Sequence, residues 1–325
     1  MSFPIDAVIT WVDGNDPAHK ARRAAYGDPS AASYDDVAGD TRYDSLGEIF
    51  WCVASLNRFA PWIRRIFIVT DRQDPHVEPV MRRWFPDGVI PTEVVDHSVI
   101  FRGHEACLPV FNSVAIETLT WRIPGLSEHY LELNDDFMLC APADPTDFFD
   151  ESGRPVCYAS RQNRLWTCFT RSLKPLFMGR RPVTFKGMML HGAQRAGRGL
   201  RYLKLDHTPR ALLRSEFESW FGAHPDALAE NIGCRFRSPD QFSPEVLQYH
   251  LLDSRGFLEV RPVRGRLFFL QPKGKPGYVD AKLDRLRKGG FRFCCFNSLD
   301  KATPDERGRI LAWIGGRLGI DMNLV

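Results

Sequence analysis

Short apolar runs that end on acidic residues constrain the fold of this 325-residue chain most strongly. Ile5 to Val12 is rich in β-branched residues and runs into Asp13, and Ile63 to Thr70 runs into Asp71. Between them, apolar side chains recur at helical spacing from Leu46 to Leu56 and stop before a proline. A strand, a helix and a second strand with an acid at each strand end are typical of a βαβ unit in a mostly parallel sheet.

The same pattern continues to residue 150. Glu93 to Val95 is predicted to form a short strand, Val110 to Trp121 has helical periodicity, and the apolar run Tyr130 to Leu133 is predicted to form a further strand. We therefore expect residues 1–150 to form an α/β core, in which helices flank a mostly parallel sheet.

A polar trio with two acids, Asn134-Asp135-Asp136, separates the last of these runs from a second one, Phe137 to Leu139. Two adjacent carboxylates at the end of a buried strand are costly unless a positive group lies against them, and a divalent cation that carries phosphates meets this need. Ligands of open α/β sheets bind beyond the carboxyl ends of the strands, so Asp13, Asp71 and this pair are expected to converge on one crevice. The trio indicates an enzyme that acts on a nucleotide-activated substrate.

The composition changes after residue 150. Glycine and proline become frequent, and basic residues gather between Arg161 and Lys186, where they could bind a polyanionic chain or a membrane surface. We expect residues 151–290 to form a helical, basic insertion or lid, and residues 291–325 to return to the core near Phe291 to Phe296 and end in a helix.

Local signals predict where loops and helices begin. Ala18 to Asp44 is polar and irregular, which is typical of a mobile loop over a site. Thr208-Pro209, Ser243-Pro244 and Thr303-Pro304 each place a capping residue before a proline, so each is predicted to begin a helix.

The composition limits the class of protein. A formal net charge of +3 gives no global field that favours nucleic acid. The apolar runs are short and the N-terminus lacks the pattern of a signal peptide, so we expect a cytoplasmic protein, peripheral at most at the inner face of the cytoplasmic membrane. Eight cysteines without a CxxC pair indicate neither a zinc cluster nor a disulfide framework.

Several strings resemble the signature blocks of the Stealth family. These sugar-1-phosphate transferases include bacterial capsule polymerases and the lysosomal-enzyme N-acetylglucosamine-1-phosphotransferase. Ile5 to Pro17 resembles the first block, Glu48 to Gln73 the second and Ile123 to Phe149 the third. His207-Thr208-Pro209 and Arg235-Phe236-Arg237-Ser238 resemble later motifs, and the similarity covers most of the chain in the right order.

The resemblance implies an activity and a fold. It implies transfer of a hexose 1-phosphate from a UDP-sugar to a glycan hydroxyl, which forms a phosphodiester and releases UMP in capsule or exopolysaccharide synthesis. It also implies a GT-A-like, Rossmann-like core that uses Mg²⁺ or Mn²⁺. The expected partners are the UDP-sugar donor and the glycan acceptor, not nucleic acid; association with a capsule-assembly complex and a homodimer are left open.

The same resemblance indicates the metal ligands. The chain departs from the family pattern at two positions. Asp135 and Asp136 are the expected ligands, because Mg²⁺ is held in proteins by one or two carboxylates, and Asn297 is the C-terminal candidate. Many members have an acid where this chain has Ser298, which cannot supply a carboxylate. Many also have an arginine where this chain has Ala54, so a phosphate contact is missing.

Catalytic roles follow from the later motifs. His207 is the motif histidine and the expected base that deprotonates the acceptor hydroxyl, with Asp136 beside it. The guanidinium of Arg235 is expected to donate hydrogen bonds to the oxygens of the transferring phosphoryl group, with Arg237 as the alternative. Without the resemblance, we would expect His207 to pack or cap at a helix start, and Arg235 to be a solvated or salt-bridged arginine.

The donor is expected at the end of the first strand. Its base and ribose would be held by backbone groups of Thr10, Trp11, Val12, Asp13 and Gly14, although Trp11 could equally belong to the core. Asn112 could bind the sugar or cap a helix. Four further histidines are expected to be structural: His97, His104, His129 and His191.

Two other functions remain compatible with the sequence. An ordinary metal-dependent glycosyltransferase would use the same donor, attack the anomeric carbon and release UDP. A non-catalytic glycan-binding or nucleotide-binding module on a degenerate enzyme fold would explain Ala54 and Ser298. The acidic pair alone does not separate these alternatives.

Overall fold

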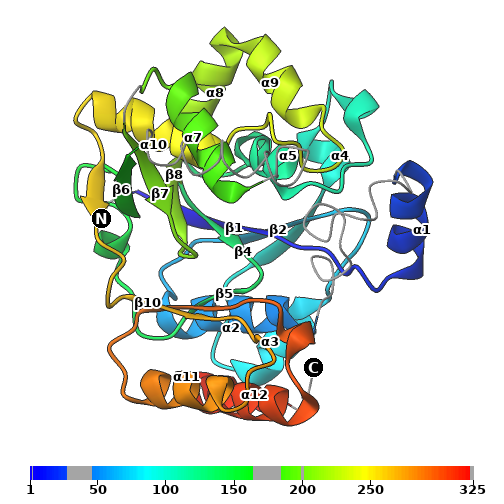
Figure 1. The fold of residues 1–325 in the computed structure, drawn as a ribbon, viewed down its shortest axis with the longest axis vertical. Coiled ribbons are helices and arrows are strands. Elements are labelled where there is room, and N and C mark those ends of the chain that lie inside the picture. Colours follow the sequence, from blue (N-terminus) through cyan, green and yellow to red (C-terminus); the bar gives the residue numbers. More distant parts are fainter. Residues whose placement is uncertain (2, 28–45, 164–183, 199–200, 323–325) are drawn as a thin grey trace.

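A five-stranded sheet forms the centre of the protein (Figure 1). The computed structural model describes residues 1, 3–27, 46–163, 184–198 and 201–322. The strand order is β3-β2-β1-β4-β8. The first four strands are parallel, and β8 is antiparallel to β4. Their bounds are Thr92–Asp96 (β3), Ile66–Thr70 (β2), Ile5–Thr10 (β1), His129–Asn134 (β4) and Arg210–Leu213 (β8).

Two three-stranded sheets accompany the central sheet. The first has the order β10-β11-β5, with bounds Leu267–Leu270, Phe293–Phe296 and Phe137–Leu139. The second has the order β7-β6-β9, with bounds Arg201–Leu205, Val156–Asn163 and Glu259–Arg261. The chain passes directly from β4 to β5 through Asp135 and Asp136. The acidic pair therefore lies in the connection between two sheets.

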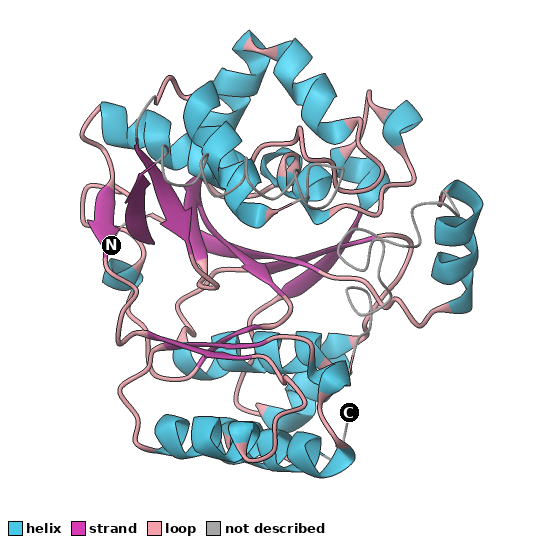
Figure 2. Ribbon diagram, in the orientation of Figure 1, coloured by secondary structure: helices cyan, strands magenta, loops and turns pink. Residues whose placement is uncertain are grey.

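Helices cover both sides of the central sheet (Figures 1 and 2). Helices α7 to α10 lie on one side, and α2, α3, α11 and α12 lie on the other. Their bounds are Pro17–Tyr26 (α1), Glu48–Phe59 (α2), Val77–Trp84 (α3), His97–Ile100 (α4), Ser113–Glu117 (α5), Phe185–Arg195 (α7), Arg214–Ala223 (α8), Pro225–Ile232 (α9), Pro244–Ser254 (α10), Tyr278–Arg287 (α11) and Pro304–Leu318 (α12). Within the described ranges, none of these helices is both long and apolar enough to cross a bilayer.

The buried strands explain the fold class. All five residues of β2 are buried, as are the first five of β1, because helices cover both faces of a parallel sheet. Each fully buried Ile, Val or Phe side chain in these strands contributes about 1.5–3 kcal/mol relative to its exposed state. The expected α/β fold with a mostly parallel sheet is confirmed.

Several local predictions are confirmed by the helix caps. The helix expected from Leu46 onward is α2, which ends at Phe59. Ser243 caps α10, where its Oγ accepts a hydrogen bond from the Val246 amide at 3.3 Å. Thr303 and Glu306 form the capping box of α12.

Two local predictions are wrong for identifiable reasons. Residues 18–26 of the expected loop lie in α1, because the Asp16 side chain caps the amides of Ala18 and His19 and Pro17 occupies the first turn. Residues 28–45 lie outside the described part. Thr208-Pro209 begins no helix. It leads into β8, which is fully buried where it pairs with β4, so pairing in the sheet overrides the capping signal.

The second half of the chain is not separate from the core. Its strand β8 forms an edge of the central sheet, and β10 pairs with β11. The strand expected near Phe291 to Phe296 is present as β11, but it belongs to the smaller sheet with β5. The division of the chain at residues 150 and 290 stays a prediction. Most of the basic stretch from Arg161 to Lys186 lies outside the described residues.

Candidate functional site

A pocket of about 480 Å³ opens at the carboxyl ends of the parallel strands. Its lining includes Thr10 at the end of β1, Asp71 after β2, His97 after β3 and Asn134 at the end of β4. Side chains from the β7–β8 connection and from the turn after β11 complete the wall. This is the edge at which open α/β sheets bind ligands. Asp71 and the pair Asp135-Asp136 line the pocket as expected, whereas Asp13, which was expected there too, does not.

Four carboxyl groups line one part of this pocket, and we call them the acidic wall: Glu48, Asp135, Asp136 and Asp300. Burial raises the pKa of Asp135 well above its usual range, and the neighbouring charges of Asp136 and Glu48 raise it further. Burial also raises the pKa of Glu48 to about 7, and Asp136 and Asp300 add to this. Two buried carboxyl groups whose pKa values are raised by burial and by neighbouring carboxylates favour a bound cation.

The acidic wall offers the oxygen ligands that Mg²⁺ and Mn²⁺ prefer. Asp136 Oδ2 accepts hydrogen bonds from Asn297 Nδ2 at 3.0 Å and Cys295 Sγ at 3.3 Å. Asn297 Oδ1 in turn accepts from Gln271 Nε2 at 3.0 Å and from Ser298 Oγ at 2.9 Å. Asn297 therefore presents its amide nitrogen to Asp136. Its oxygen could bind a cation there only if the side-chain amide flipped.

Ser298 takes the place where the resemblance predicts a second acid. It lines the pocket with a left-handed backbone, at φ 54° and ψ 51°. Such a backbone is costly for a residue other than glycine and is often found at functional sites. Asp300, two residues later, supplies the pocket-lining carboxyl group of this turn.

Glu48→Gln is expected to change how stability depends on pH in the absence of divalent cations. The folded pKa of Glu48 lies near 7, above the usual 4.5, so the folded chain keeps a proton that the unfolded chain loses between these values. The wild type should therefore lose stability as the pH rises from about 4.5 to 7, by up to about 3 kcal/mol. Urea denaturation at pH 5 and pH 8 should show a smaller loss in the variant. An equal loss in both proteins would contradict the assignment.

His207 lies in the β7–β8 connection and lines the pocket. Its ring stacks on Phe269 with centroids 4.8 Å apart and meets the edge of Phe137 at 5.9 Å. Burial lowers the pKa of His207, against the opposing effect of Asp136. The ring is therefore neutral near pH 7 and can accept a proton.

The two candidate arginines have different surroundings. Arg235 lies outside the pocket lining, where its Nη1 donates to the carbonyl oxygens of Leu108 at 2.9 Å and Pro109 at 3.0 Å. Arg237 lines the pocket, and its Nη2 donates to Ser113 Oγ at 2.7 Å. Arg235 therefore holds a backbone turn, and the alternative, Arg237, is the one that a ligand in the pocket can reach.

Only part of the segment predicted to bind the donor lies in the pocket. Thr10, Trp11 and Val12 line the pocket, whereas Asp13 and Gly14 do not. Asp13 lies in a loop, where its backbone amide donates to Gln73 Oε1 at 2.9 Å and its carbonyl accepts from Gln73 Nε2 at 2.9 Å. These bonds tie the end of β1 to the segment after β2.

Asn112 occupies the pocket wall as a helix cap. Its Oδ1 accepts from the Val114 amide at 3.2 Å at the start of α5. Its Nδ2 donates to the Cys234 carbonyl at 2.9 Å and to Gln241 Oε1 at 2.8 Å. Both amide protons are therefore used within the protein, which favours the capping role over sugar binding.

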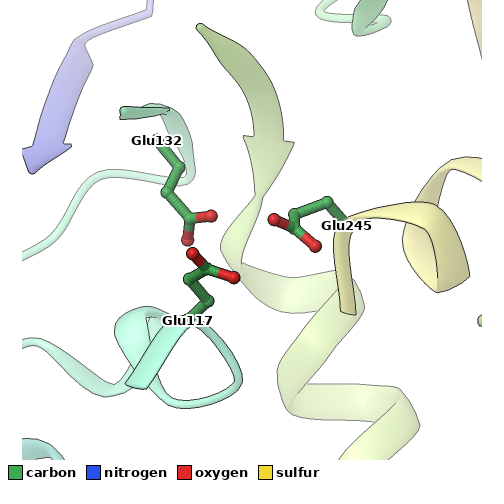
Figure 3. Close-up of side chains that lie close together, drawn as sticks. All are labelled: Glu117, Glu132 and Glu245. Carbon is green, nitrogen blue, oxygen red and sulfur yellow. The ribbon is translucent and has the colours of Figure 1, made fainter. Parts of the chain in front are cut away.

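A second acidic group lies deeper and was not expected as a group from the sequence (Figure 3). Carboxylate oxygens of Glu117, Glu132 and Glu245 lie within 4.8 Å of one another, and all three side chains are buried. Arg210 contacts Glu132 at 3.4 Å and forms a shorter ion pair with Glu245. Burial raises the pKa of Glu117 to about 7, and the charge of Glu245 contributes. Because the guanidinium of Arg210 already neutralises part of the charge of this group, the group is less suited to a divalent cation than three free carboxylates would be.

Arg210→Met is expected to destabilise the fold by about 3–5 kcal/mol. The substitution removes the buried cation and leaves the three carboxyl groups to repel one another. Urea denaturation measures the loss. Arg214→Met is the matched control, since Arg214 pairs with Glu218 at 3.0 Å on the surface and such pairs contribute at most about 1 kcal/mol. Equal effects of the two variants would refute this account of Arg210.

The fold and the pocket define an α/β protein with an acidic ligand site at the strand ends. The Stealth protein conserved region 1 matches residues 3–29, and conserved region 2 matches residues 42–157. The chain belongs to the Stealth family.

Named relatives extend the match over more of the chain. The exopolysaccharide phosphotransferase SCO6023 of Streptomyces coelicolor is 39% identical over 254 residues, which are 77% of this chain and 40% of that protein. The capsular polysaccharide phosphotransferase WcwK of Streptococcus pneumoniae is 28% identical over 322 residues, 93% of each chain. The chain thus spans less than half of the Streptomyces relative and nearly all of the Streptococcus one.

Two solved structures also match by shape. The galactosyltransferase LgtC, in complex with donor and acceptor sugar analogues, has a TM-score of 0.42 and 11% identity, and the match covers 96% of this chain and 95% of LgtC. The apo form of mouse xyloside xylosyltransferase 1 has a TM-score of 0.38 and 12% identity, covering 90% of this chain and 97% of that protein. The fold class of this chain rests on its own strand order.

Proposed function

We propose that this protein transfers a sugar 1-phosphate from a UDP-sugar to a glycan hydroxyl and releases UMP. The observation that carries the proposal is that one pocket holds both the acidic wall and the neutral ring of His207. A cation site beside a proton acceptor is what attack of a hydroxyl on a diphosphate requires. The names of the relatives support a phosphotransferase in polysaccharide synthesis.

The acidic wall would hold the donor's diphosphate through a divalent cation. Asp135 and Asp136 are the proposed ligands, with Asn297 after its amide turns over. A bound Mg²⁺ or Mn²⁺ supplies positive charge that neutralises the diphosphate and stabilises the leaving nucleotide. Glu48 and Asp300 add negative charge around this position, which favours cation binding.

His207 would take the proton of the acceptor. The acceptor oxygen attacks the phosphorus that carries the sugar, the bond from that phosphorus to the oxygen shared with UMP breaks, and UMP leaves with the bonding electrons. Arg237 is placed to contact phosphoryl oxygens, in the role expected from the sequence for Arg235. Thr10, Trp11 and Val12 would contact the nucleoside at the end of β1.

The released nucleotide tests the proposal. The purified protein would be incubated with a panel of UDP-sugars, Mg²⁺ and oligosaccharide acceptors, and the products separated by anion-exchange chromatography. Acceptor-dependent UMP is the expected result. UDP in its place would make the protein an ordinary glycosyltransferase, and no nucleotide release with any donor would favour the binding-module alternative.

A further inference from the structure

The pocket continues from the acidic wall to the ends of β2 and β3, where it is lined by Trp11, His19, Asp71, His97 and Phe111. In the order β3-β2-β1-β4, the end of β3 lies three strand spacings from the end of β4, or roughly 14 Å at about 4.8 Å per spacing. An extended nucleoside diphosphate spans a comparable distance. If the acidic wall holds the diphosphate, the nucleobase reaches the β3 end.

His97 is the exceptional side chain at that end. It is the first residue of α4, directly after β3, and it is only 4% exposed. Among the residues that the structure describes, neither ring nitrogen has a hydrogen-bond partner. Buried polar groups are normally paired, so two unpaired nitrogens on one pocket-lining residue call for a specific explanation.

The groups around His97 do not supply the missing partner. Asp71 forms an ion pair with Arg22 at 3.0 Å. Asp96 accepts hydrogen bonds from the Ser98 amide at 2.9 Å and the Arg72 amide at 2.7 Å. Burial lowers the pKa of His97 to about 4, while Asp71 and Asp96 oppose this and His19 adds to it. The ring is therefore neutral, with one N–H donor and one nitrogen acceptor.

We propose that His97 recognises the nucleobase of the donor through its unpaired ring nitrogens. A neutral imidazole matches the in-plane donors and acceptors of a base, whereas a phosphate favours a cationic group. Phe111 stands at the same end and offers an aromatic face, and its ring stacks on Phe236 with centroids 5.4 Å apart. This inference rests on the proposed function, because it places the diphosphate of a nucleotide donor on the acidic wall.

Binding measurements on the purified full chain test the inference without catalysis. Isothermal titration calorimetry in Mg²⁺ would compare UDP, CDP, ADP and GDP with inorganic pyrophosphate, which has no base. His97→Phe removes the nitrogens and keeps a ring that can still pack against Phe101. It is expected to weaken the tightest nucleotide roughly tenfold and to leave pyrophosphate unchanged.

Two further variants make the result specific. His97→Gln restores a donor and an acceptor and should recover part of the lost affinity. His129→Phe is the matched control, because His129 Nδ1 is also unpaired among the described residues but His129 lies outside the pocket lining. Nucleotide affinity should not change in this variant. If circular dichroism shows that His97→Phe does not fold, His97→Leu replaces it.

The outcomes distinguish failure of the His97 inference from failure of the proposed function. If the His97 variant binds the preferred nucleotide as tightly as the wild type, His97 is a packing residue and the inference fails while the proposed function stands. If both ligands weaken equally, the effect is structural and the inference also fails. If the wild type binds neither nucleotides nor pyrophosphate in Mg²⁺, the proposed function fails as well.

Discussion

Asp136→Asn is expected to lower turnover by about a thousandfold and to abolish the benefit of added Mg²⁺. A bound cation contributes several kcal/mol of charge stabilisation to phosphoryl transfer, and each 1.36 kcal/mol is a factor of ten in rate. Asp136 lines the pocket beside Asp135, where it also acts on the pKa values of Glu48 and His207. The amide keeps the shape of the side chain, so the loss reports on the carboxylate charge.

Metal binding can be measured without activity. Titration with Mn²⁺ followed by electron paramagnetic resonance should show a bound ion in the wild type and at least tenfold weaker binding in Asp136→Asn. Asp150→Asn is the matched control. Its carboxylate pairs with Arg154 at 2.8 Å, away from the pocket, so both metal binding and turnover should stay at wild-type levels. Unchanged Mn²⁺ affinity in Asp136→Asn would exclude this carboxylate as a ligand.

The parallel part of the fold could be predicted from the sequence because its signals are local. Strands β1, β2 and β4 are largely apolar runs, interrupted by Asp6 in β1 and Glu132 in β4, and α2 shows clear helical periodicity. The carboxyl ends of parallel strands meet at one edge, so the position of Asp135 and Asp136 follows once the strands are identified.

The wrong predictions have a common physical cause. Thr208-Pro209 carries a valid capping signal, but the following residues are buried against β4, and pairing in the sheet decides their conformation. The loop prediction after Pro17 is wrong in the opposite direction, because Asp16 belongs to a cluster of turn residues and yet caps a helix. Local signals of about one kcal/mol do not determine an element whose tertiary contacts contribute more.

The site residues, too, were only partly predictable from the sequence. His207 and Asp136 lie in recognisable strings, whereas Glu48 looks like an ordinary acid in the first turn of a helix. The packing of α2 against β5 brings Glu48 to the acidic wall, and this contact is not visible in the sequence. The choice between Arg235 and Arg237 also depends on tertiary contacts, because a difference of two positions decides which guanidinium faces the pocket.

His207→Ala is expected to lower turnover by about 10²- to 10⁴-fold, the usual contribution of a positioned general base. Its pH dependence distinguishes this role from a packing role. The neutral ring is the active form, and burial lowers the pKa of His207 below the usual 6.5. Wild-type turnover should therefore be low at acid pH, where the ring is protonated. It should rise with pH and reach its plateau before neutrality. The residual turnover of His207→Ala should lack this acid limb.

A second histidine provides the control for this experiment. His224→Ala removes an exposed ring that stacks on Trp220 with centroids 4.3 Å apart, outside the pocket lining. This variant should keep both turnover and the acid limb. If His207→Ala loses turnover but keeps the acid limb, another group takes the proton and His207 acts only through its contacts with Phe269 and Phe137. Because the ring packs on both side chains, the melting temperature of His207→Ala must be measured alongside, so that loss of fold is not counted as loss of the base.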